Sequence, residues 1–148
     1  MSDNPVSYPT EHSSKFTLLE MLIILLLVGL VFVFIVPVNR SRLNEQRVYQ
    51  ALESMKVLGE QAEIFKNNPA NGYYPFDLSQ MNLKTIPDTT YFSYSINDKD
   101  STLVAKTTKR FGGKPAYLVY SLSAKQFQVG KDDSDTDSKR VINENWLP

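Results

Sequence analysis

The sequence contains no cysteine, and its 148 residues include a single histidine, His12. The lack of cysteine excludes a disulfide framework and any metal site built from thiolates. One histidine in the polar N-terminal segment cannot supply a zinc site of several imidazoles or a histidine base for the serines further along the chain. The sequence therefore predicts a protein that is not an enzyme.

A net charge of either sign is also lacking, because 16 basic residues balance 16 acidic ones. A polyanion binder that uses its whole surface would carry a clear excess of lysine and arginine, so this class is excluded. The length suits one ordinary domain, or a membrane helix followed by one small domain.

The most informative feature is an apolar run over residues 16–38, in which Glu20 is the only charged side chain. As a helix this run would be about 35 Å long, enough to cross a bilayer. A cleaved secretory signal is disfavoured because Asp3 and Glu11 precede the run and no pair of small residues follows it. Inserting an acidic side chain at the middle of a bilayer costs about 2.5–3.5 kcal/mol of free energy. The presence of Glu20 in this run therefore suggests a specific role.

The residues around Glu20 resemble a known signal. Residues 16–20 read Phe-Thr-Leu-Leu-Glu, and Gly29 and Pro37 follow in the same apolar run. This pattern is similar to the class III signal sequences of type IV pilins and type II secretion pseudopilins. The likeness is close over residues 15–37, and only the expected architecture matches beyond them.

The resemblance implies a site for each of these residues. A prepilin peptidase would remove residues 1–15 as a leader by cutting between Lys15 and Phe16, and the new amine of Phe16 would be methylated. Glu20 would pair with the amine of Phe16 on a neighbouring subunit, and the helix would bend at Gly29 or Pro37. The implied partners are membrane lipid, an inner-membrane assembly platform and other pilin-like subunits in a type IV pilus or a type II secretion pseudopilus.

Two interpretations of the function remain open. Lys15 stands where the family has glycine before the cut, so the chain could also be an unprocessed, single-pass anchored binding domain that does not polymerise. In that case Glu20 would be an acid tolerated at headgroup depth. Arg40, Arg42 and Arg47 after the span favour a cytoplasmic C-terminal domain. The resemblance implies the opposite, a domain outside the cytoplasm and a filament in the periplasm or outside the cell.

The remaining residues predict an α+β fold with one long helix against a small antiparallel sheet. Residues 39–67 are amphipathic, and Pro69 ends the pattern. Apolar side chains recur every three or four residues at Val48, Leu52, Met55, Leu58, Ala62 and Phe65. The head, residues 68–148, shows alternating runs that start near Tyr91, Leu103, Ala116 and Phe127. These runs predict three or four strands packed on the apolar face of the helix.

An acidic stretch near the C-terminus is the best candidate for a metal site. Asp133, Asp135 and Asp137 alternate, and Glu144 falls at the twelfth position, in the outline of an EF-hand calcium loop. Ser138 replaces the glycine that such a loop requires, and a solvated acidic turn is the favoured interpretation. In the related family, pseudopilin heads can carry calcium in a C-terminal acidic loop, which keeps Ca²⁺ as a candidate cofactor.

Four basic residues surround the second expected turn between strands: Lys106, Lys109, Arg110 and Lys114. They could contact nucleic acid by releasing counterions. Phe111 is the single aromatic residue among them, and a solvated hairpin end is favoured over a nucleic-acid partner.

Overall fold

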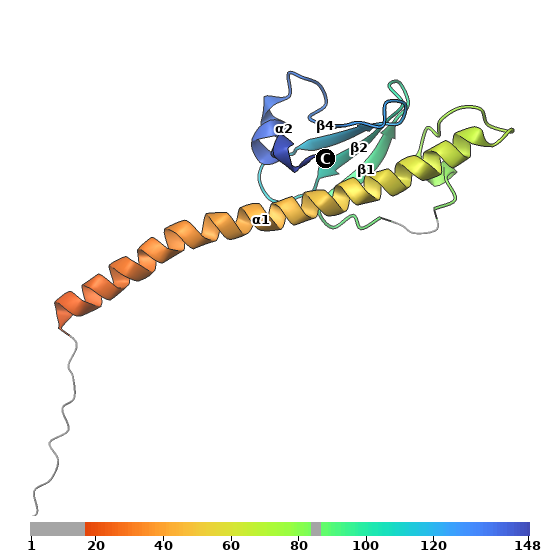
Figure 1. The fold of residues 1–148 in the computed structure, drawn as a ribbon. Coiled ribbons are helices and arrows are strands. Elements are labelled where there is room, and N and C mark those ends of the chain that lie inside the picture. The colour runs from red at the N-terminus through yellow and green to blue at the C-terminus, as the bar shows by residue number, and fades with distance from the viewer. Residues whose placement is uncertain (1–16, 84–86) are drawn as a thin grey trace, which may run out of the picture. The chain divides into compact units, whose positions relative to one another are not determined.

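The computed structural model describes residues 17–83 and 87–148. It has the expected α+β fold, in which one long helix packs against a four-stranded antiparallel sheet (Figure 1). Contacts divide the chain into two units, Met1–Asn39 and Arg40–Pro148, and helix α1 (Leu18–Asn67) contributes to both. The sequence-based end of the helix near Pro69 is confirmed.

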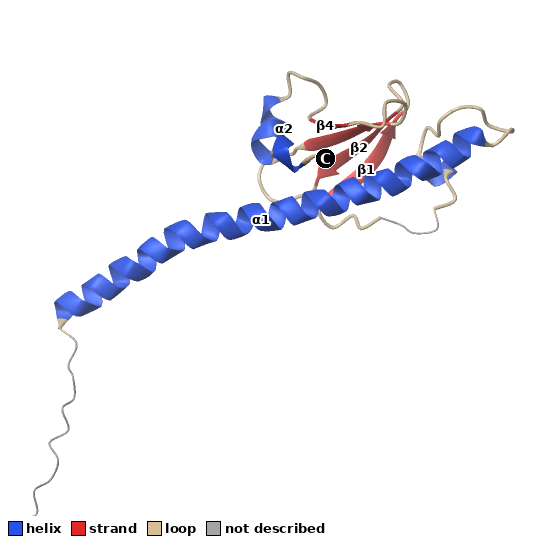
Figure 2. Cartoon of the chain, viewed as in Figure 1, coloured by secondary structure: helices blue, strands red, loops and turns tan. Residues whose placement is uncertain are grey.

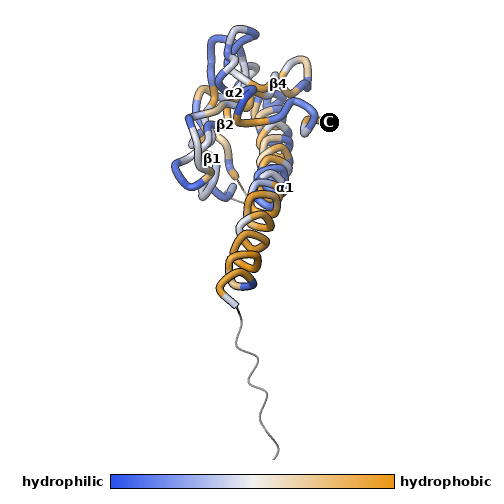
Figure 3. Tube along the Cα trace, turned by 90° about the vertical axis from the view of Figure 1, so that its left-hand side faces the viewer, coloured by the Kyte–Doolittle hydropathy of each residue, from blue (hydrophilic) through white to orange (hydrophobic). Residues whose placement is uncertain are grey.

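The first half of α1 is apolar on every side, as the hydropathy colouring in Figure 3 shows. By length and composition it could cross a membrane, and it is the only such helix in the described part of the chain. Pro37 lies inside α1. Gly29 has no neighbouring atom within 4 Å of the place where a Cβ would stand. The bend expected at these two residues stays a prediction.

The second half of α1 lies along the sheet and forms one side of the core (Figure 2). Its buried residues recur at helical spacing, so that a single face is covered. They are Val48, Ala51, Leu52, Met55, Leu58, Gly59 and Ala62. The predicted apolar face is confirmed for most positions. Phe65 is only half-buried, while Ala51 and Gly59 are two small residues that the apolar pattern did not include.

The sheet is a meander in the order β1-β2-β3-β4, so every strand pairs with its neighbour in the sequence. The strands are β1 (Phe92–Asn97), β2 (Thr102–Thr107), β3 (Tyr117–Ser121) and β4 (Phe127–Val129). Phe92 is opposite Thr107, and Leu103 is opposite Tyr120. This register aligns the apolar members of each alternating run on one face, where they meet α1.

Three short helices complete the second unit: η1 (Leu78–Gln80), α2 (Thr136–Val141) and η2 (Glu144–Trp146). Helix α2 corrects the sequence analysis, which treated the acidic stretch as a loop. The missed signal was Asp135 followed three residues later by Ser138, because Asp is a preferred N-cap residue. Asp135 caps α2 by accepting a hydrogen bond from the Ser138 amide.

Candidate functional site: the apolar helix and Glu20

The candidate site begins with the apolar surface of α1, which nothing in the described chain covers. Its large side chains from Leu18 to Val38 are 40–81% exposed. A soluble monomer rarely shows one contiguous apolar patch larger than a few hundred Å². This surface suits a lipid or protein environment, and a helix of this length with one charged residue near its start could span the hydrocarbon of a bilayer.

Glu20 closes the first turn of this helix together with Thr17. The Thr17 amide donates to Glu20 Oε2 at 2.7 Å, and the Thr17 hydroxyl donates to the same oxygen at 3.0 Å. The Glu20 amide donates to Thr17 Oγ1 at 3.3 Å. These reciprocal bonds form a capping box, which satisfies amides that a helix start leaves without partners.

The capping box gives Glu20 a role that the sequence analysis missed, although Thr17 and Glu20 carry the readable signal, a Thr-x-x-Glu pattern. Both bonds that reach the Glu20 carboxylate end on Oε2. Oε1 accepts no hydrogen bond from residues 17–83 or 87–148, so it stays available to a cation. The arrangement can thus hold the carboxylate in place and still present one oxygen outward.

The residues expected at the cleavage site, Lys15 and Phe16, lie outside the described residues. The pairing of Glu20 with the amine of Phe16 therefore stays a prediction.

The acidic stretch has a structural role at Asp135. Asp135 Oδ1 accepts from the Ser138 amide at 3.0 Å. Asp135 Oδ2 accepts from the Ser138 hydroxyl at 2.8 Å and from the Lys131 amide at 3.1 Å. The fully buried Ser138 in turn accepts from the Tyr117 amide at 3.0 Å. This chain of bonds ties α2 to the start of β3.

The other acidic residues of the predicted calcium loop face different partners. Glu144 pairs with Lys139 at 2.9 Å, whereas Asp137 lies 3.6 Å from Lys114 and 3.8 Å from Arg140. Asp133 is exposed. Within the described ranges no group of three or more His, Cys, Asp or Glu residues is placed to hold a metal ion. The four acidic residues of the predicted EF-hand loop therefore do not converge on one point, and calcium binding stays a prediction.

The hydrogen bonds of Asp135 also set its charge state. The amide of Ser138, then the amide of Lys131 and the Ser138 hydroxyl, lower the pKa of the Asp135 carboxyl below its ordinary value. Each of these donors favours the ionised form. Asp135 therefore remains a carboxylate at neutral pH and holds α2 as an anion.

The basic residues around the second turn have different surroundings. The ammonium of Lys106 lies 5.8 Å from the centre of the Tyr117 ring, and Lys114 pairs with Asp137. Lys109 and Arg110 are exposed. The preference for a solvated hairpin end over a nucleic-acid partner stays a prediction.

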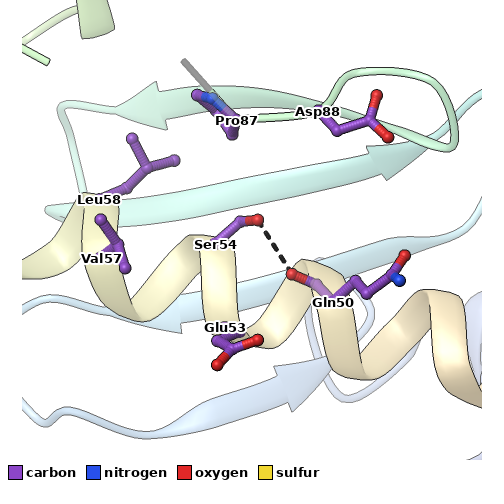
Figure 4. A pocket seen from close by; sticks show the side chains of 7 residues that line it. All are labelled: Gln50, Glu53, Ser54, Val57, Leu58, Pro87 and Asp88. Carbon is purple, nitrogen blue, oxygen red and sulfur yellow. Dashed lines mark hydrogen bonds between the residues drawn. The ribbon is translucent and has the colours of Figure 1, made fainter. Parts of the chain in front are cut away.

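A hollow of about 400 Å³ lies between α1 and the segment before β1, where Figure 4 shows its lining. Ser54 Oγ donates to the Gln50 carbonyl, so the hydroxyl is engaged in its own helix. Glu53 and Asp88 do not point toward one another in Figure 4.

Comparisons with known proteins do not add to this picture. No family model matches the chain, and no significant match is found among curated proteins or solved structures.

Proposed function

We propose that the chain is a structural subunit of a filament of the pilin type: a pilin, minor pilin or pseudopilin. In this proposal residues 16–38 first hold the subunit in the membrane and later pack in the filament core. The second unit, Arg40–Pro148, carries the head (residues 68–148) and lies outside the cytoplasm. The observation that carries the proposal is an uncovered apolar helix with a single carboxylate, Glu20, in its first turn.

The position of Glu20 supports assembly because an acid in lipid is costly when alone and is stabilised when paired. Thr17 holds one oxygen of the carboxylate, and Oε1 faces no donor in the described chain. An amine from a second subunit would complete the pairing. The remaining helix contacts are apolar and non-directional, so this ion pair would fix the register between neighbouring helices.

A second candidate function is a single-pass anchored domain that does not polymerise. The capping box favours it, because Glu20 then has a local structural role without any partner subunit. Lys15 in place of glycine before Phe16 also favours it. The intact mass of the membrane-extracted protein separates the two candidates. Loss of residues 1–15 with one added methyl group supports the subunit, and an intact Met1 supports the anchored domain.

Substitution of Glu20 tests the assembly role directly. Gln keeps the shape and can still accept from Thr17 in a capping box, but it cannot form an ion pair. Glu20→Gln should therefore leave the protein in the membrane and abolish most of its incorporation into filaments, nearly as completely as Glu20→Ala. Sedimentation of sheared filaments, followed by immunoblotting, measures the incorporated fraction.

Thr17→Val is the matched control, since it removes the hydroxyl of the cap and leaves the Glu20 charge in place. We expect it to assemble. Normal assembly of Glu20→Gln, in cells where Phe16 is shown to be the N-terminus, would contradict the ion-pair proposal. If Thr17→Val failed to enter filaments while Glu20→Gln entered them normally, assembly would depend on the capping box and not on the charge of Glu20.

A further inference from the structure

An arginine-lined groove lies at the start of the second unit. Its hollow has a volume of about 670 Å³, and its lining includes Arg40 and Arg47 from α1 and Arg140 from α2. Arg40 and Arg47 are seven residues apart, which places them on the same face of the helix two turns from each other. Gly112 and Gly113 form another part of the wall.

The positive charge of this groove is largely unneutralised. Within the described chain, neither Arg40 nor Arg47 has a carboxylate within 4.0 Å, and Arg140 has only Asp137 at 3.8 Å. Asp137 is itself shared with Lys114. Arginine presents a planar fork of donors that matches the oxygens of a phosphate group. The groove is therefore chemically suited to bind an anion.

Two features of the groove favour the binding of an anion: a fixed guanidinium and two backbone amides. The guanidinium of Arg47 lies 4.1 Å from the centre of the Tyr91 ring and donates to Asn44 Oδ1 at 3.0 Å, so its position is fixed. Gly112 and Gly113 have φ angles of 91° and 83° and no side chains. Their amides donate no hydrogen bond to any described residue, which leaves two donors beside the arginines.

The position of Arg40 directly after the apolar run places the groove next to the membrane surface when that run spans a bilayer. Arg40 follows Val38, the last residue of the apolar run, by only two positions. When residues 16–38 cross a bilayer, Arg40 must emerge in the headgroup layer, which is roughly 5–8 Å deep on each side of the hydrocarbon. Lipid phosphates are concentrated in that layer, and anionic lipids attract basic side chains next to a span.

We infer that this groove binds the phosphate of an anionic phospholipid headgroup beside the emerging helix. The inference rests on the membrane anchoring in the proposed function. The bound phosphate would neutralise arginines that otherwise oppose placement of the head outside the cytoplasm, and it would hold the subunit at the surface until the helix leaves the bilayer.

Native mass spectrometry of the full-length protein in neutral detergent provides the test. The lipid probes are phosphatidylglycerol and phosphatidylcholine, and inorganic phosphate serves as a competitor. We expect bound phosphatidylglycerol in preference to phosphatidylcholine. Arg40→Gln should weaken it by roughly fivefold, the share of one juxtamembrane cation. The variant with Arg40, Arg47 and Arg140 all changed to Gln should lose binding by roughly a hundredfold.

Arg42→Gln is the matched control, because Arg42 lies only two residues further from the span than Arg40 and does not line the groove. It should retain the binding of the parent protein. If Arg42→Gln and Arg40→Gln weakened phosphatidylglycerol binding equally, the inference would be overturned, because the lipid would then respond to the general positive charge near the span and not to the groove. Equal affinity for the two lipids would also overturn it, as would displacement of phosphatidylglycerol by an equal concentration of inorganic phosphate.

Alkaline carbonate extraction of membranes separates this inference from the proposed function. Release of the chain by carbonate would overturn both, because the groove would then have no lipid surface beside it. Retention of the chain in the membrane, combined with no preference for phosphatidylglycerol, would overturn the groove alone.

Discussion

At the scale of single residues, Asp135 links the pH of the solution to the packing of α2. Its ionised form accepts three hydrogen bonds from Ser138 and Lys131, which lower its pKa in the folded state. A carboxyl with a lowered folded pKa binds fewer protons when folded than when unfolded. Its contribution to stability is therefore present above the unfolded pKa of about 3.9 and is lost as the pH falls through the folded pKa.

We predict that the Arg40–Pro148 fragment melts at a lower temperature as the pH falls below about 4. Asp135→Asn should already lower the melting temperature at pH 7, by roughly 4–8 °C. The same variant should show a smaller further fall in acid, because residue 135 no longer titrates. Circular dichroism melts between pH 7 and pH 2.5 measure both effects. Asp133→Asn, at an exposed carboxyl, should follow the parent curve, and an identical curve for Asp135→Asn would contradict the role of the cap.

Gly59 is a second residue whose role depends on a close contact. A Cβ built at Gly59 would lie 2.7 Å from Cε1 of the Tyr120 ring, and this ring is buried between α1 and β4. Alanine would gain about 1 kcal/mol of helix propensity but would overpack the core at a cost of about 1–3 kcal/mol. The steric cost should win because a Cβ at 2.7 Å would force the ring to shift, and the ring packs against Phe127 with 4.6 Å between the ring centres.

We therefore predict that Gly59→Ala destabilises the Arg40–Pro148 fragment by up to about 2 kcal/mol in urea unfolding. Combining Gly59→Ala with Tyr120→Leu removes the opposing ring, so the two substitutions together should cost less than the sum of their separate effects. Strict additivity would show that the contact with Tyr120 is not the cause.

The sequence predicts some of these residues and not others, for physical reasons. Glu20 stands out because a charge in an apolar run is rare. Its partner Thr17 was readable from the capping pattern, which concerns only neighbouring residues. Gly59 could not be assigned, because its contact with Tyr120 joins positions that are 61 residues apart in the sequence. Periodicity reports which face of a helix is apolar, but it does not report which side chain lies opposite.

At the scale of elements, α1 offers two adjacent positions with opposite surroundings. Leu58 is 1% exposed and lies in the core, whereas Val57 is 48% exposed on the outer side of the helix. Leu58→Ala should lower the free energy of unfolding by about 2–5 kcal/mol, since it removes buried methyl groups and leaves a cavity. Val57→Ala should change it by no more than about 0.5 kcal/mol.

Urea unfolding of the Arg40–Pro148 fragment measures both variants side by side. Similar losses from Leu58→Ala and Val57→Ala would contradict the packing of this helical face against the sheet.

The strands and α1 could be predicted from the sequence because their side-chain periods are long and regular. Helix α2, with six residues, could not, because it has too few turns to establish a period. It is held by its cap at Asp135 and by the bond from Tyr117 to Ser138, which depends on tertiary placement. The same residues explain why the acidic run does not follow the EF-hand outline, since Asp135 is used by the helix start.

At the scale of the whole molecule, the two units favour different environments: the first exposes an apolar surface, and the second buries its apolar residues in a core. The side chains of residues 18–38 are exposed and apolar, whereas Arg40–Pro148 has its own buried core. We predict that the full chain needs detergent to stay dispersed and that the Arg40–Pro148 fragment is soluble and monomeric without it. Size-exclusion chromatography with light scattering measures both. Aggregation of the fragment would mean that its core also depends on residues before Arg40.

The meander order of the sheet also affects how the head acquires its structure. Each strand joins the strand that precedes it in the chain, so no pairing has to wait for a distant segment. Low contact order of this kind shortens the search and favours rapid folding. Because β1 to β4 follow α1 in the sequence, the hairpins can form one after another as the chain is synthesised. The exposed backbone edges of each new strand are then covered within a short time, which lowers the risk of aggregation during folding.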